Sequence, residues 1–327
     1  MNRTVAIIGC GLIGRGWIIL FANAGYRVQV YDASGQAPAL AADAVKANLQ
    51  LLQQEEMIGS AEELLSRVHY CSTLGEAVEA AEYVQESVPE VLDTKRAVFD
   101  EIGRLAAPDA VLASSCSTIP PEQFLEHVAH RERCLIVHPF SPPHLIPLVE
   151  LVPTRWTSTA AVERTRQRMI ELGQVPVLIR KAVVGFAVNR LQAAVINEAL
   201  SLVADGVIAP ADLDLCVSQG LGLRWAFLGP FETMELNAPK GFMDYATKFG
   251  GVYRSILDTM RVDRPWSRQA IDAVESWRRA ELPGEADVVR RRLWRDHNLM
   301  KLAKLFRGRK LGREDKLGRE DKLGGSA

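Results

Sequence analysis

Short apolar runs rich in β-branched residues alternate with longer stretches of helical periodicity along the first half of the chain. The apolar runs are predicted to be strands, and they cover residues 5–8, 27–31, 68–71, 83–86, 110–114, 134–138, 148–152 and 175–179. Strands that alternate with helices of about 10 to 15 residues are typical of crossover units. The first half is therefore predicted to form an α/β unit whose mostly parallel sheet is covered by helices on both faces.

The apolar pattern becomes helical after residue 185. Apolar side chains then recur near helical spacing for about twenty residues, and no convincing strand follows. Gly206, Pro210 and the pair Gly229-Pro230 stand where helices are expected to end or begin. The second half is therefore predicted to be all-helical, and the expected division is a first domain over residues 1–183, a helical domain over 184–308 and a charged, mobile tail over 309–327.

A glycine motif follows the first predicted strand and opens the first predicted helix. Gly9, Gly11 and Gly14, with Leu12 and Ile13 between the last two, stand at the spacing GxGxxG. In this context the glycines allow a tight turn, a close approach of the backbone to a pyrophosphate, and close packing of the helix on the strand. Free amides at the helix N-terminus bind the phosphates. The sequence thus predicts a Rossmann-type dinucleotide site at these five residues.

Asp32 ends the second predicted strand, and its position bears on which dinucleotide is bound. A carboxylate there accepts hydrogen bonds from the adenosine ribose and repels a 2′-phosphate. Residues 33–35 are Ala, Ser and Gly, so they offer no cation to neutralise such a phosphate. NAD is therefore the predicted cofactor, in preference to NADP.

Composition argues against several other classes of function. The 327 residues include 39 basic and 40 acidic ones, and the 5 cysteines contain no CxxC pair. A balanced charge does not favour nucleic acid or an anionic membrane, and no apolar run reaches the roughly 18 residues of a membrane span. Scattered cysteines fit a reducing compartment. We therefore expect a cytoplasmic protein without a bound metal, a nucleic acid partner or a membrane partner.

Nicotinamide chemistry moves a hydride and a proton, and one histidine stands where a proton acceptor is needed. His138 ends an apolar strand, at the edge where open α/β sheets bind ligands. Glu150 lies inside another apolar run, where a carboxylate requires a partner. An imidazole held by that carboxylate is a general base suited to neutral pH. Spacing alone leaves open that His138 is structural and Glu150 unrelated to it.

Several motifs together resemble a known enzyme family. Besides the glycine motif, the chain carries SSCS at 114–117, HPFSPP at 138–143, LVE at 148–150 and GFAVNR at 185–190. This combination is similar to the L-3-hydroxyacyl-CoA dehydrogenase superfamily and spans both predicted domains. The runs PLVELVP at 147–153 and GLGLRWAFLG at 220–229 resemble its branch that contains lambda-crystallin, L-gulonate 3-dehydrogenase and their bacterial relatives.

The resemblance implies a role for each of four residues in catalysis. His138 would be the general base, and Glu150 would orient it. Ser117 and Asn189 would donate hydrogen bonds to the substrate oxygen. Donors aimed at an oxygen that develops alkoxide character act mainly in the transition state, which agrees with this assignment.

The resemblance also implies contacts to the cofactor and an oligomeric state. Glu90 and Lys95 correspond to a family segment that flanks the nicotinamide. The helical domain is rich in apolar stretches with little else to cover them, so it is expected to form a homodimer, as in the family.

Arg224 bears on the class of substrate. It precedes a GPFE motif at 229–232, where acyl-CoA members of the superfamily typically lack a cation. A guanidinium binds a carboxylate through two parallel hydrogen bonds. We therefore expect a small L-3-hydroxy acid, such as L-gulonate or 3-hydroxybutyrate, to bind at Arg224, with Ser141 shaping the pocket where relatives often carry Asn. A surface arginine or an interface salt bridge is the alternative interpretation.

Other functions stay open at this point. A short-chain 3-hydroxyacyl-CoA dehydrogenase is one alternative, and an NAD-binding crystallin without catalysis is a remote one. A 6-phosphogluconate-type enzyme would use a lysine, but no GGxxGAG-like segment precedes the helical domain. L-Carnitine dehydrogenases share the LRW run, and their quaternary ammonium requires an aromatic cage, for which the candidates are Trp225, Phe227, Phe231 and Phe242.

Overall fold

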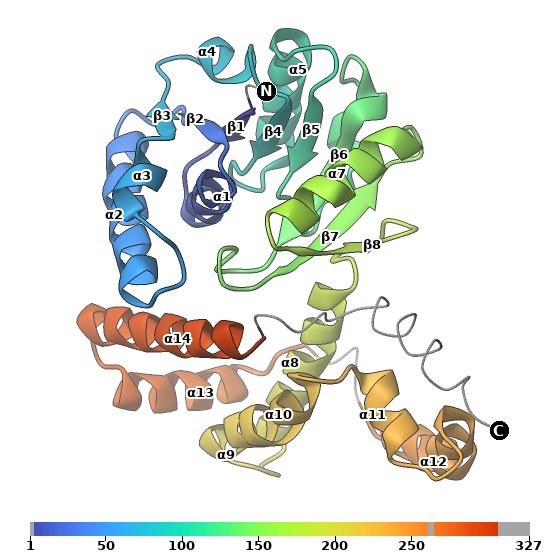
Figure 1. Ribbon diagram of the computed structural model, residues 1–327. Helices are drawn as coiled ribbons and strands as arrows, with labels where there is room; N and C mark the ends of the chain where they lie inside the picture. Colours follow the sequence, from blue (N-terminus) through green and yellow to red (C-terminus); the bar gives the residue numbers. More distant parts are fainter. Residues whose placement is uncertain (1–2, 261–264, 307–327) are drawn as a thin grey trace, which may run out of the picture. The chain divides into compact units, whose positions relative to one another are not determined.

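The computed structural model describes residues 3–260 and 265–306 (Figure 1). These residues form two compact units, the first made of residues 3–186 with residues 292–306, and the second of residues 187–260 with residues 265–291. The chain passes from the first unit to the second after residue 186, close to the expected domain boundary after residue 183. The chain returns to the first unit inside α14 (Glu285–Phe306), so the end of that helix belongs to the first unit. The tail expected over residues 309–327 lies outside the described residues.

An eight-stranded sheet organises the first unit, in the order β3-β2-β1-β4-β5-β6-β7-β8. Every neighbouring pair is parallel except β6 with β7, which confirms the mostly parallel sheet. The strands agree with the predicted runs to within one residue at each end, and they are β1 (Thr4–Ile8), β2 (Arg27–Tyr31), β3 (Val68–Tyr70), β4 (Tyr83–Glu86), β5 (Val111–Ser114), β6 (Cys134–Pro139), β7 (Leu148–Pro153) and β8 (Val175–Leu178).

The strands are apolar on both sides because both faces of the sheet are covered. Ile7 packs in one buried core with Phe21, whereas its neighbour Ile8 packs in a second core with Phe99. Successive strand residues point to opposite faces, so a sheet between two cores needs uninterrupted apolar runs. The helices of this unit are α1 (Leu12–Asn23), α2 (Ala37–Gln54), α3 (Ala61–Leu65), α4 (Leu74–Val78), α5 (Leu92–Leu105), α6 (Glu122–Leu125), the short 3₁₀ helix Arg131–Arg133, and α7 (Thr159–Glu171).

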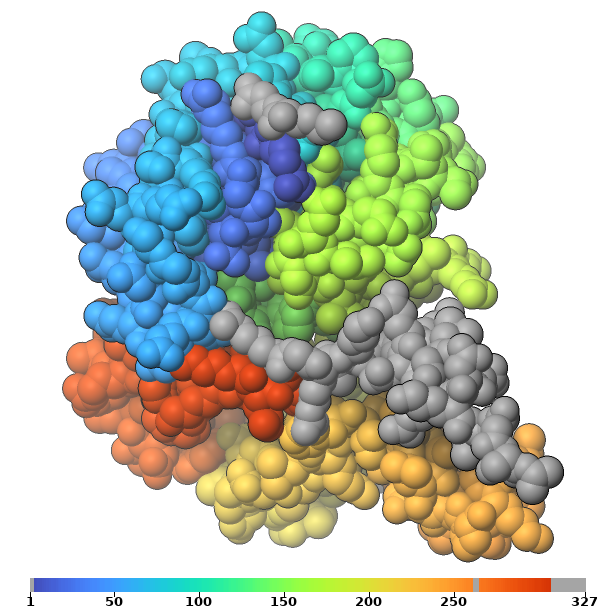
Figure 2. Space-filling model, in the orientation of Figure 1, coloured from blue at the N-terminus to red at the C-terminus, as the bar shows by residue number. Residues whose placement is uncertain are grey.

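The end of α14 is held on the first unit by packing and by charge. Met300 is buried in the same core as Phe21. Just beyond α2, Glu55 pairs with His297 at 3.0 Å and with Lys304 at 3.2 Å. In Figure 2 the red end of α14 lies against light-blue atoms of the α2 and α3 region. A helix that begins in one unit therefore ends as part of the other.

β7 runs antiparallel to β6, because only residues 140–147 join the two strands. A parallel return requires a crossover of about a dozen residues or more. The antiparallel register pairs His138 of β6 directly with Glu150 of β7. The two residues that spacing could only suggest as partners are thus opposite each other in one strand pair.

The described part of the second unit contains helices joined by turns and no strand, as predicted. Three of its helical segments follow one another without a break, because the π-helical stretch Cys216–Leu221 joins α9 (Pro210–Leu215) to α10 (Gly222–Trp225). Its other helices are α8 (Val188–Ala204), α11 (Pro230–Leu236), α12 (Phe242–Leu257), α13 (Arg268–Glu281) and the start of α14. Across both units, no helix in residues 3–260 and 265–306 is long and apolar enough to cross a membrane.

Candidate active site

The glycine loop between β1 and α1 has the backbone that a dinucleotide requires. Gly9 has a φ of +91°, and a Cβ there would lie 2.7 Å from the carbonyl carbon of Ser87. A Cβ on Gly14 would lie 1.9 Å from the carbonyl oxygen of Gly9, so helix and turn pack too closely for a side chain. A Cβ on Gly11 would meet no protein atom within 4 Å. Gly11 therefore leaves room for a ligand beside the free amides of α1.

Asp32 closes one side of this loop, as expected for a ribose-binding carboxylate. Its Oδ2 accepts hydrogen bonds from the backbone N–H of Cys10 at 2.9 Å and from the Cys10 thiol at 3.4 Å. Its Oδ1 accepts one from the backbone N–H of Ser34 at 2.9 Å. Burial, and then the Asp32 charge, raise the pKa of Cys10 to about 12, so the thiol stays a donor. The carboxylate is thus fixed at the end of β2, and these residues fit NAD.

His138 and Glu150 form a buried pair. The Nδ1 atom of His138 lies 2.8 Å from Oε2 of Glu150. His138 is 5% exposed and Glu150 is fully buried. A carboxylate can only accept a hydrogen bond, so Nδ1 carries the proton and Nε2 keeps its lone pair. The imidazole is therefore held in the tautomer that a general base needs.

Two aromatic rings fix the plane of this imidazole. Phe140, two residues along the chain, contacts the His138 ring edge to face, with centroids 4.7 Å apart. Phe186, at the end of the first unit, contacts it with centroids 5.7 Å apart. The ring therefore has one orientation that satisfies both the carboxylate and the aromatic packing.

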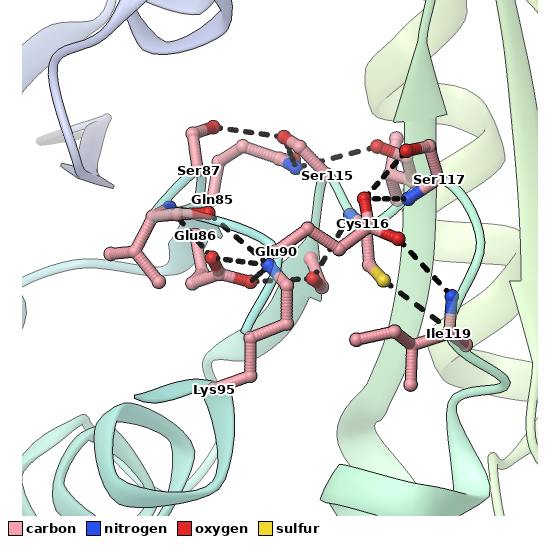
Figure 3. A network of polar contacts seen from close by, with 12 residues as sticks. Gln85, Glu86, Ser87, Glu90, Lys95, Ser115, Cys116, Ser117 and Ile119 are labelled. Atoms are coloured by element: carbon pink, nitrogen blue, oxygen red, sulfur yellow. Dashed lines mark hydrogen bonds and ion pairs between the residues drawn. The ribbon is translucent and has the colours of Figure 1, made fainter. Parts of the chain in front are cut away.

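Glu90 binds the turn that carries Ser117 (Figure 3). Its Oε2 accepts hydrogen bonds from the Ser117 backbone at 3.0 Å and from the Ser117 hydroxyl at 2.5 Å. Its Oε1 accepts from the backbone N–H groups of Thr118 and Ile119 and from the Thr118 hydroxyl. Burial disfavours the charged form, but the hydrogen bonds from Ser117 and Thr118 outweigh it and lower the pKa of Glu90 to about 2. Glu90 is therefore an ionised carboxylate that holds the segment after β5 through these hydrogen bonds.

Lys95 points inward to Glu86. Both residues are buried, and the Lys95 ammonium lies 2.8 and 3.0 Å from the two carboxylate oxygens of Glu86 and 3.4 Å from the carbonyl of Val88. These contacts use its three N–H bonds. Glu86 also accepts from the Ser114 hydroxyl at 2.5 Å. Lys95 thus holds the turn after β4, and its predicted contact with the cofactor remains a prediction.

Three other predicted residues lie in different parts of the molecule. Ser141 is exposed on the connection between β6 and β7. Asn189 lies in the first turn of α8, and Arg224 is exposed in α10, so both belong to the second unit. Their roles remain predictions.

Sequence reasoning missed Gln85 and Glu86, although a signal was present. Both are fully buried polar side chains at the end of the apolar strand β4. The argument that identified Glu150, a buried polar group that requires a partner, applies equally to them. The short length of β4 and the position of these polar residues at its end, where solvent exposure is the usual expectation, obscure the signal.

Comparisons with known proteins agree with this geometry. Residues 4–183 match the family model described as "3-hydroxyacyl-CoA dehydrogenase, NAD binding domain", and residues 185–276 match the one described as "3-hydroxyacyl-CoA dehydrogenase, C-terminal domain". The two matches meet near the boundary between the units.

Relatives of known name cover nearly the whole chain. A lambda-crystallin homolog of Bos taurus is 42% identical over 92% of this chain and 95% of its own length. An L-carnitine dehydrogenase of a Pseudomonas species is 36% identical over 91% of this chain and 92% of its own. Among solved structures, a 5-formyl-3-hydroxy-2-methylpyridine 4-carboxylic acid 5-dehydrogenase, described as an NAD+ dependent dismutase, has a TM-score of 0.77 at 28% identity. The match covers 95% of this chain and 100% of the other.

Proposed function

The chain belongs to the 3-hydroxyacyl-CoA dehydrogenase family and is an NAD-dependent oxidoreductase, and from this premise we propose that it oxidises the 3-hydroxyl group of a small L-3-hydroxy acid to the 3-keto acid. The observation that carries the proposal is the buried pair of His138 and Glu150. NAD, when bound at the glycine loop, supplies the hydride acceptor.

His138 takes the hydroxyl proton in this proposal. Nε2 has the free lone pair, because Nδ1 donates to Glu150. When Nε2 accepts the proton, the imidazolium lies against a carboxylate that is already ionised and desolvated, so Glu150 stabilises the new charge. The proton is later released from the same atom.

Ser117 and Asn189 are proposed as donors to the substrate oxygen. The Ser117 hydroxyl donates to Glu90 in this structure. A hydroxyl has one proton, so Ser117 must rotate that proton away from Glu90 to serve the alkoxide. Glu90 stays bound to the turn during such a rotation, because backbone N–H groups donate three of the hydrogen bonds that it accepts.

Arg224 supports a substrate with a free carboxylate. It is exposed in α10 and forms no ion pair with any residue that the structure describes. A cation without an internal counter-ion is available to a carboxylate ligand. Ser141, which is exposed three residues after His138, is proposed as a further substrate-binding residue.

A substrate panel tests this proposal. The purified protein is incubated with NAD and with L-gulonate, L-3-hydroxybutyrate, L-3-hydroxybutyryl-CoA or L-carnitine, and NADH is followed by absorbance. We expect kcat/KM for a free hydroxy acid to exceed that for the thioester by about tenfold or more. A preference for the thioester or for L-carnitine contradicts the proposed substrate class.

The role of Arg224 has a matched control in the same unit. We expect Arg224→Met to lower kcat/KM on the preferred acid by about tenfold or more, the range for a charged hydrogen bond. Arg254→Met removes an arginine of α12 that pairs with Asp258 at 2.9 Å, and it should leave kcat/KM unchanged. A loss below about threefold in Arg224→Met argues against the carboxylate contact.

We also propose that the second unit forms a homodimer interface. Its exposed apolar side chains include Phe231 at 72% and Met243 at 74% exposure. Large apolar side chains exposed to this extent are typical of surfaces that a partner covers. A second copy of the chain supplies the same surface, as a two-fold interface requires.

A further inference from the structure

A chain of hydroxyl and amide groups runs along the carboxyl ends of β4 and β5. The Ser115 hydroxyl is its centre, with the indole N–H of Trp17 at 3.0 Å, the amide nitrogen of Gln85 at 2.8 Å and the Ser87 hydroxyl at 2.8 Å. Figure 3 shows the Ser87 end of this chain. The predicted catalytic residues do not account for it.

The direction of each hydrogen bond at Gln85 is fixed by its surroundings. The Gln85 Oε1 atom accepts from the Tyr83 hydroxyl at 2.6 Å, and the Gln85 amide nitrogen also faces the carbonyl of Val137 at 3.4 Å. A carbonyl only accepts, so the atom facing Val137 is the NH₂ group. Gln85 therefore donates to Ser115.

The direction at Ser115 follows from the same counting. A hydroxyl oxygen accepts up to two hydrogen bonds and has one proton to give. The indole N–H of Trp17 can only donate, and Gln85 donates as well, so Ser115 accepts from both. The Ser115 proton is left for Ser87, so Ser87 accepts that hydrogen bond. The proton of Ser87 itself has no acceptor among the residues that the structure describes.

Ser87 lies at the point of the sheet where a dinucleotide crosses. Its backbone N–H donates to Ile8 at 2.7 Å, and its carbonyl carbon is the atom that excludes a Cβ from Gly9. β1 stands between β2 and β4, so strand order reverses there. Asp32 follows β2 on one side, whereas His138 lies near the carboxyl end of β6 on the other. Ser87, after β4, is thus on the catalytic side of the glycine loop.

We propose that the Ser87 hydroxyl donates a hydrogen bond to an oxygen of NAD in the half of the dinucleotide beyond the adenosine monophosphate. Because Ser115 donates to Ser87, the Ser87 proton is left for another acceptor before the ligand arrives. Ser87 and Ser115 are both half-buried, whereas Trp17 and Gln85, which donate to Ser115, are fully buried. Ser87 is a cofactor-binding residue in addition to those that the glycine motif predicts.

Ligand fragments test the proposal without turnover. Dissociation constants for NAD+, ADP-ribose and AMP are measured by calorimetry on the wild type and on Ser87→Ala. We expect Ser87→Ala to weaken NAD+ and ADP-ribose by about three- to tenfold, the range for one neutral hydrogen bond. AMP, which lacks the second half, should bind equally well to both proteins.

Two variants serve as controls. Ser87→Thr keeps the hydroxyl and should retain most of the affinity for NAD+. Ser66→Ala removes an exposed hydroxyl at the C-terminal end of α3, where it donates to the carbonyl of Glu63. This variant should change none of the three dissociation constants. Unchanged NAD+ binding in Ser87→Ala overturns the proposal. An equal loss for AMP also overturns it, because the effect then arises outside the half of the ligand assigned to Ser87.

Discussion

The two units differ in how much apolar surface they bury. The first unit has two cores, one on each face of the sheet, with side chains as large as Trp17 and Phe99 fully buried. Among the described residues of the second unit, Ala238 and Ala270 are the only apolar ones that are buried. The first unit is therefore stabilised by its own core, whereas the second requires cover for its helices.

This difference matches the tasks proposed for each unit. The first unit holds ionisable groups in fixed positions, and buried pairs such as His138 with Glu150 need a rigid, desolvated surrounding. The second unit presents apolar helix faces and, at Arg224, a surface cation with no ion pair among the described residues, so its chemistry depends on what it binds. Four measurements test the contrast.

The largest effect is expected at the buried pair of the first unit. His138→Gln should lower kcat by about 100-fold or more while the dissociation constant for NAD+ stays unchanged, because the general base is lost and the glycine loop is intact. Steady-state kinetics and calorimetry give the two values. His127→Gln, at an exposed position, is the control and should match the wild type. Wild-type turnover in His138→Gln removes this residue from the mechanism.

The next effect is expected at the surface of the second unit. Phe231→Asp should weaken the proposed homodimer by about 2 kcal/mol or more, the scale of a large buried aromatic at an interface. Sedimentation velocity at several concentrations measures the change. Leu40→Asp replaces an exposed leucine of α2 in the first unit, at 61% exposure, and should leave the association unchanged. If both variants behave alike, the units do not differ in the way described.

A smaller effect is expected from the hydrogen-bond chain behind Ser87. Ser115→Ala leaves the buried N–H of Trp17 without its acceptor and removes one of the two acceptors of the Gln85 amide, so the free energy of unfolding should fall by about 1 to 3 kcal/mol. Ser201→Ala removes a hydroxyl that donates within α8 of the second unit, and it should cost less than about 0.5 kcal/mol. Urea unfolding compares the two. Equal losses mean that the first unit gains nothing from this buried network.

The smallest effect is expected at Glu90 and depends on pH. Its pKa of about 2 lies below the ordinary value of 4.5, so the folded state favours the ionised form. The stabilisation is present above the ordinary pKa and is lost as the pH falls from about 4.5 through about 2. The stability difference between wild type and Glu90→Gln should therefore shrink over that range in chemical unfolding at a series of pH values. A difference that is constant with pH contradicts the role of the charge.

Much of the fold could be predicted from the sequence, because it depends on local pattern. Each strand of the first unit is an apolar run between turn residues, and the glycine motif at Gly9 to Gly14 specifies the loop by spacing alone. The helical character of the second half follows from periodicity in the same way. The division inside α14 could not be predicted, because a continuous helix gives no sequence signal of which unit its end packs against.

The site was predicted in part, for a related reason. His138 and Glu150 were identified because each has an unusual position in an apolar run. The inward direction of Lys95 and the hydrogen bonds that Glu90 accepts from Ser117 depend on contacts between separate strand ends, which sequence order does not reveal. Ser87 and Ser115 have no distinctive position in the sequence. Their roles follow only from the donors and acceptors that surround them in the structure.

The antiparallel pairing of β6 with β7 makes the catalytic pair sensitive to chain length in one place. Side chains of a strand alternate between faces, so inserting or deleting a single residue within β7 before Glu150 turns its carboxylate toward the opposite core, away from the imidazole. The connection at residues 140–147 lies outside the ladder, and its length can vary without changing which face either residue occupies. Natural variants of this enzyme should therefore differ in the length of that connection and not in the length of the strands beside it.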